Sequence, residues 1–72
     1  MELLNNSIEH NLKTLYNLVF DENGEVKPCG RTNCINLIQF IDGITHTSGI
    51  YGNKDTGEMN IDAIKEFVKT RL

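Results

Sequence analysis

The segment from Pro28 to Ile44 constrains the fold more than any other part of this chain of 72 residues. It begins with the only proline and holds both cysteines. Proline restricts the residue before it to extended geometry, which suits a turn that leads into a helix. The apolar residues that follow cover more than one face of a helix over about 31–42, and such a helix must be surrounded by other elements. We therefore predict a buried central helix there, ended by Gly43.

A second helix is predicted over about 7–20, because four apolar residues recur there at helical spacing: Ile8, Leu12, Leu15 and Val19. Asn6 followed by Glu9 fits a capping box at its start. Leu4 extends the apolar stripe backwards, so an earlier start stays open. The dipeptide Asn23-Gly24 favours a turn after this helix, since both residues accept a positive φ.

A third helix is predicted over about 61–71, with Asn60 as its N-cap and Asp62 in its first turn. Residues 44–60 before it are either an ordered loop or a short β-hairpin that pairs about 48–51 with about 58–59. The expected fold is therefore mainly α, with three helices in a single small domain, residues 1–72.

Composition and charge exclude several classes of function. Seven basic residues face ten acidic ones, which gives a net charge of −3 and disfavours binding to nucleic-acid phosphates. The longest apolar run is too short to span a bilayer, so no membrane partner is expected. The N-terminus lacks the pattern of a signal peptide, and we expect a cytoplasmic protein. Abundant Asn and Ile with a single Ala hint at a bacterial or phage origin.

The small size of the chain predicts self-association. A domain of this length buries only ~60% of the surface of its unfolded chain and gains stability from a partner subunit. Leu3, Leu18 and Phe20 fall outside the main stripe of the helix over 7–20, and we expect them to add exposed apolar surface. A homodimer or higher homo-oligomer would cover it.

Motifs for catalysis, metals and redox chemistry find little support. Cys29 and Cys34 do not form a Cys-x-x-Cys motif, and Cys34 reads as a small core residue. His10 and His46 lack the short ligand spacing of zinc modules, and neither Gly-containing turn has the residue order of a calcium loop. We therefore expect no metal, no cofactor and no enzymatic activity.

The best chemical candidate is an anion site. Gly30, Arg31 and Thr32 open the central helix, where unpaired backbone N–H groups, a guanidinium and a hydroxyl can converge. A second set of donors follows the other end of that helix and consists of His46, Thr47, Ser48 and Tyr51. A helix length separates the two sets in one chain, whereas two antiparallel subunits could join them. The alternative is that Gly30 and Thr32 only cap the helix.

Taken together, these features favour a small non-enzymatic protein that acts through contact with another protein. The alternative is a homo-oligomer that binds or sequesters an anionic, phosphate-bearing small molecule such as a nucleotide.

Overall fold

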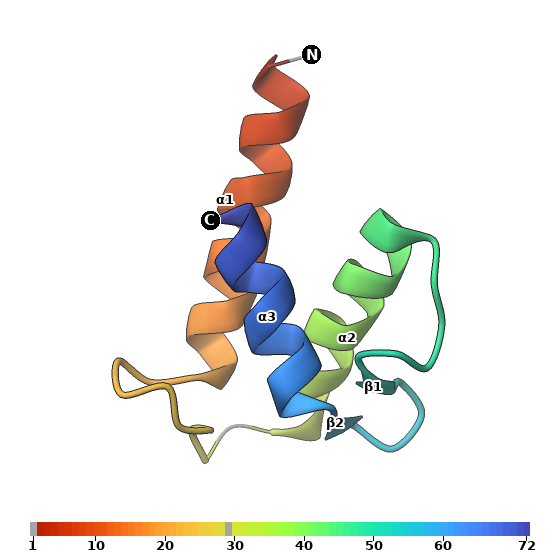
Figure 1. Ribbon diagram of the computed structural model, residues 1–72. Helices are drawn as coiled ribbons and strands as arrows, with labels where there is room; N and C mark the ends of the chain where they lie inside the picture. The colour runs from red at the N-terminus through yellow and green to blue at the C-terminus, as the bar shows by residue number, and fades with distance from the viewer. Residues whose placement is uncertain (1, 29) are drawn as a thin grey trace.

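The computed structural model describes residues 2–28 and 30–72, with side chains from Ser7 onward. It contains three helices, α1 (Glu2–Val19), α2 (Arg31–Thr45) and α3 (Ile61–Arg71), and a two-stranded hairpin before α3 (Figure 1). The predicted mainly α fold with three helices is confirmed. Of the two alternatives predicted for residues 44–60, a loop or a hairpin, the structure has the hairpin.

Helix α1 begins at Glu2, five residues before the predicted start at Ser7. The capping box at Asn6 is therefore wrong, because Asn6 lies inside the helix. The physical reason is that nothing in the first turn opposes helix formation, while Leu4 continues the apolar spacing. In Figure 1 the first turns of α1 extend past the ends of both other helices.

The chain reverses after α1 through the predicted turn. Gly24 has a φ of 79°, and Oδ1 of Asp21 accepts hydrogen bonds from the backbone N–H groups of Asn23 and Glu25 at 2.9 and 3.0 Å. Phe20 then pairs with Val26 through an isolated antiparallel bridge. Phe20 is only 1% exposed, so the prediction that it adds exposed apolar surface is wrong. The returning chain covers it, and the Tyr16 ring stacks on it with 4.6 Å between the ring centroids.

Helix α2 occupies the centre, between α1 and the hairpin. Four of its side chains are buried: Cys34, Leu37, Ile38 and Ile41. Gly43 does not end it, contrary to the prediction, because a single glycine weakens a helix without stopping it. The helix ends instead at His46, which adopts the left-handed conformation (φ 56°, ψ 40°) and donates its N–H to the Asp42 carbonyl. Cys29, two residues before the start of α2, lies outside the described residues.

The hairpin pairs β1 (Gly52–Asn53) with β2 (Glu58–Met59) in antiparallel register, Gly52 opposite Met59. The second strand is where the sequence predicts it, and the first lies just after the predicted 48–51. Asn60 then caps α3 as predicted, with Oδ1 accepting from the Ala63 N–H at 3.4 Å.

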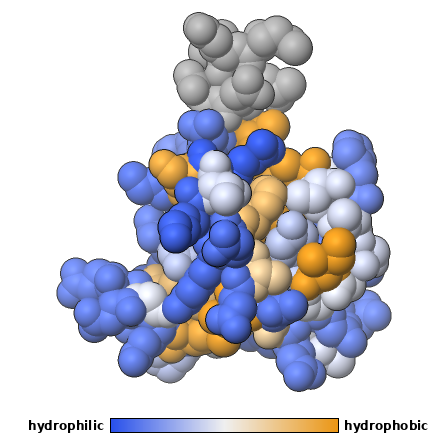
Figure 2. Space-filling view, in the orientation of Figure 1, coloured by the Kyte–Doolittle hydropathy of each residue, from blue (hydrophilic) through white to orange (hydrophobic). Residues whose placement is uncertain are grey.

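One core joins the elements. Among the described residues its buried members are Leu12, Val19, Phe20, Cys34, Leu37, Ile38, Ile41, Ile64 and Val68. On the face shown in Figure 2, apolar side chains also reach the surface in separate patches between polar ones. Within the described residues, no helix has both the length and the apolar character needed to cross a membrane.

Candidate functional site

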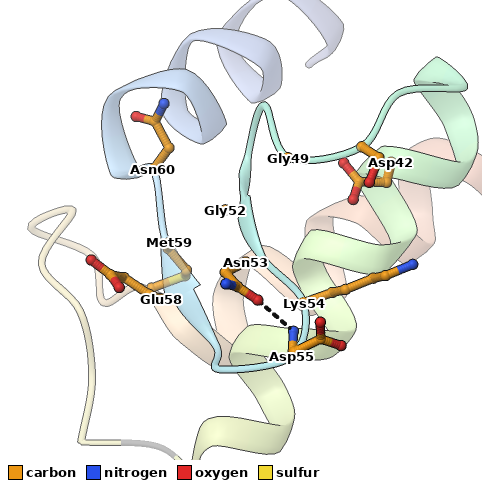
Figure 3. A pocket seen from close by; sticks show the side chains of 10 residues that line it. Asp42, Gly49, Gly52, Asn53, Lys54, Asp55, Glu58, Met59 and Asn60 are labelled. Carbon is orange, nitrogen blue, oxygen red and sulfur yellow. Dashed lines mark hydrogen bonds between the residues drawn. The ribbon is translucent and has the colours of Figure 1, made fainter.

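A hollow of about 430 Å³ lies between the end of α2, the loop after it and the hairpin (Figure 3). Polar residue types predominate among the residues that line it: Asp42, Ser48, Gly49, Gly52, Asn53, Lys54, Asp55, Glu58, Met59 and Asn60. A second hollow of about 340 Å³ adjoins it and shares Asp42, Ser48 and Lys54. We refer to both together as the loop–hairpin hollow.

Asn60 fixes the loop that forms one wall. Its Nδ2 donates to the Ile50 carbonyl at 3.1 Å, and its backbone N–H donates to the Tyr51 carbonyl at 3.0 Å. The Tyr51 ring packs edge-on against Phe67 of α3, with 5.5 Å between centroids. One residue therefore both starts α3 and holds the loop against the hairpin.

Gly52 brings the hairpin close to α2. Its φ of 144° suits glycine, and a Cβ there would lie 2.5 Å from the Glu58 carbonyl and 2.8 Å from Cδ1 of Ile38. Only a residue without a side chain fits at this contact. The spacing between α2 and β1, and hence the width of the hollow, depends on it.

The hairpin turn is built around Asn53. Its Oδ1 accepts from the N–H groups of Asp55 and Thr56 at 2.8 and 3.2 Å, and its carbonyl accepts from the Gly57 N–H at 2.8 Å. Gly57 has a φ of 81°, and its α-carbon faces the aliphatic stem of Arg31. The turn thus rests on the first turn of α2 and holds Lys54 and Asp55 exposed at the rim.

At the other wall, the end of α2 is tied to the loop. Oγ1 of Thr45 donates to the Ile41 carbonyl at 2.8 Å and lies 2.6 Å from Oγ1 of Thr47. The Thr47 N–H donates to the Asp42 carbonyl at 3.1 Å. These bonds fix the direction in which the chain leaves the helix toward Ser48.

Asp42 is the most unusual group in the hollow. Its Oδ1 is buried and has no hydrogen-bond partner among the described residues. A buried acceptor without a donor is rare in folded proteins and costs about 1–3 kcal/mol. In Figure 3 the side chains of Asp42 and Lys54 lie on the same side of the hairpin, whereas Glu58 points away from them.

The structure divides the predicted anion-site residues between the two ends of α2. Gly30, Arg31 and Thr32 are exposed at its start, separated from the second set by 15 residues, or ~22 Å of helix. Ser48 and Thr47 line the loop–hairpin hollow, while His46 is exposed at the cap. Tyr51 contacts α3 instead. One chain does not join the two sets, as the helix length led us to expect.

Sequence reasoning missed the acidic part of the hollow. From the sequence, Asp42 is predicted to be the last residue of a helix, and residues 53–57 are predicted only to form a turn. The available signal was the turn itself, which places Lys54 and Asp55 next to each other at an exposed tip. Nothing in the sequence indicates that this tip and Asp42 line the same hollow.

Comparison with protein-family models, with curated proteins and with solved structures finds no match for this chain. Within residues 2–28 and 30–72, no three His, Cys, Asp or Glu side chains gather closely enough to hold a metal ion.

Proposed function

We propose that this is a small non-enzymatic binding protein of the cytoplasm, which contacts another protein through the loop–hairpin hollow. The volume of about 430 Å³ falls within the range of small-molecule and cofactor sites, ~300–1,000 Å³, and is large enough to receive a side chain of a partner. Backbone and side-chain polar groups converge in it. Ile50, next to Gly49 of the lining, is 49% exposed and offers an apolar contact surface beside these polar groups.

The charge of the hollow carries the proposal. Three acidic residues, Asp42, Asp55 and Glu58, line it together with one basic residue, Lys54, although the side chain of Glu58 points away from Asp42. Oδ1 of Asp42, which is buried, finds no hydrogen-bond donor among the described residues. Complementary charge steers partners to a surface and selects among them, so we expect the partner to present Arg or Lys side chains here.

Charge reversal at the rim tests this proposal. Wild-type protein, Asp55→Lys and a matched control, Glu66→Lys, serve as baits in extracts of the source cell. Both variants replace an exposed acid by lysine, but Glu66 lies on α3 outside the hollow. We expect a protein that the wild type and Glu66→Lys capture and that Asp55→Lys loses. With that protein purified, Asp55→Lys should weaken binding by about tenfold or more.

Two results would contradict the proposal. One is the same set of captured proteins on all three baits, since binding would then not involve the hollow. The other is the absence of any captured protein after chemical cross-linking.

A second candidate function, binding of a phosphate-bearing small molecule, is favoured by the start of α2. Gly30, in extended conformation, offers no capping side chain, and the first turn holds no acidic residue beside the exposed Arg31. Unpaired N–H groups and a guanidinium suit a phosphate. Calorimetry against nucleotides should show binding that Arg31→Ala abolishes and Arg31→Lys only partly keeps. Equal binding by wild type and Arg31→Ala would rule out this site.

A further inference from the structure

Helix α1 has a row of residues along one edge of its core-facing stripe, and this row shares Ile8 and Leu15 with that stripe. Ile8, Asn11, Leu15 and Leu18 follow one another at spacings of three, four and three residues, and Leu4 continues the spacing in the sequence. Alternating steps of three and four residues form the seam of a two-stranded coiled coil. We call Ile8, Asn11, Leu15 and Leu18 the α1 stripe.

The molecule leaves this stripe partly uncovered. Leu18 is 45% exposed, Asn11 is exposed, and Ile8 and Leu15 are half-buried at the border of the core. The whole chain exposes 4958 Å². A compact monomer of its mass, 8.2 kDa, would expose ~4,500 Å², so about a tenth of the surface is in excess.

The stripe also lacks charge. Ser7 and Thr14, exposed along its outer edge, are uncharged, and the helical spacing places Glu9 and Lys13 toward the other side of α1. Interface centres are depleted of charged residues in the same way. In a parallel two-fold pair every residue meets its own copy, so any charge on the stripe would repel itself. None of the four residues of the α1 stripe is charged.

We infer that a second copy of this chain packs along the α1 stripe in a parallel two-fold pair. Ile8, Leu15 and Leu18 then cover their own counterparts, and the two Asn11 amides hydrogen-bond to each other, since each amide has a donor and an acceptor. A shifted register would place these amides against apolar side chains. Figure 1 shows that the first turns of α1 extend past the ends of α2 and α3. The stripe is separate from the loop–hairpin hollow, so this inference and the proposed function can fail independently.

The first experiment is sedimentation equilibrium of the full chain from low micromolar to millimolar concentration. The mass should rise from 8.2 kDa toward twice that value. Leu18→Glu should raise the dimer dissociation constant by about tenfold or more, because burying two facing carboxylates is costly. The control is Ile50→Glu, which alters an equally exposed apolar residue on the loop and should dimerise like the wild type.

The second experiment tests the register. Asn11→Lys and Asn11→Glu should each stay monomeric alone, while an equimolar mixture should form a heterodimer, since opposite charges then face each other. Circular dichroism checks that each variant remains helical. A wild type that stays monomeric at millimolar concentration would overturn the inference. Dimerisation of Leu18→Glu equal to that of the wild type, or failure of the Asn11 mixture to dimerise, would overturn it as well.

Discussion

Asp42 lies in the last turn of α2, where the unpaired carbonyl groups of a helix create a partial negative charge. A carboxylate at this end is unfavourable, and its Oδ1 is buried without a partner among the described residues. Two separate effects thus make this residue costly for the isolated chain. Costly residues at a surface hollow are typical of sites where stability is exchanged for binding.

We predict that Asp42→Asn raises the free energy of unfolding by about 0.3–1 kcal/mol, because it removes the charge from the unfavourable end of the helix dipole. The same substitution should weaken binding of a basic partner. Urea denaturation measures the first effect and calorimetry with the captured protein the second.

The matched control for this prediction is Asp62→Asn. Asp62 lies in the first turn of α3, where a negative charge is favourable, so its loss should lower stability by a similar amount. If both variants lost stability, Asp42 would have a structural role and the argument from the dipole would be wrong.

At the scale of elements, the ends of helices and the register of the hairpin are what the sequence predicts least well. Gly43 suggests a helix end, yet α2 continues to Thr45 and closes at His46, whose N–H donates to the Asp42 carbonyl. The first strand begins at Gly52 because the contact with Ile38 fixes that residue against α2. Both outcomes depend on neighbours that local patterns do not contain.

Substitution by alanine should therefore change the free energy of unfolding in opposite directions at two glycines. Gly43 is exposed inside α2, and a Cβ there would meet nothing within 4 Å. Gly43→Ala should raise the free energy of unfolding by about 0.5–1 kcal/mol, the difference in helix propensity. Gly52→Ala should lower it by about 1–3 kcal/mol, because it combines a positive φ with the clash against Glu58.

Urea denaturation of both variants checks this pair. A destabilised Gly43→Ala would mean that the glycine has a role in the adjoining hollow, which it lines. An unchanged Gly52→Ala would mean that the hairpin can shift away from α2 without loss of stability.

At the scale of the whole molecule, the sequence predicts the three helices and the general place of the hairpin, because apolar spacing and capping residues are local signals. Cys34, predicted as a core residue, is indeed buried. The loop–hairpin hollow was not predictable, because Asp42 and Asp55 are brought together only by the packing of the hairpin on α2. Burial of Phe20 was missed for the same reason: Lys65, 5.5 Å from its ring centroid, comes from α3.

The position of α3 in the chain has a consequence for synthesis on the ribosome. Ile64 and Val68 complete the core, but they are made after every residue of α1 and α2. At a translation rate of ~5–20 residues per second, the interval between the end of α2 and Val68 lasts ~1–5 s. During that time the apolar faces of the first two helices have no cover from α3. Any part of α1 and α2 that has left the ribosome in this interval therefore exposes apolar surface that the finished protein buries.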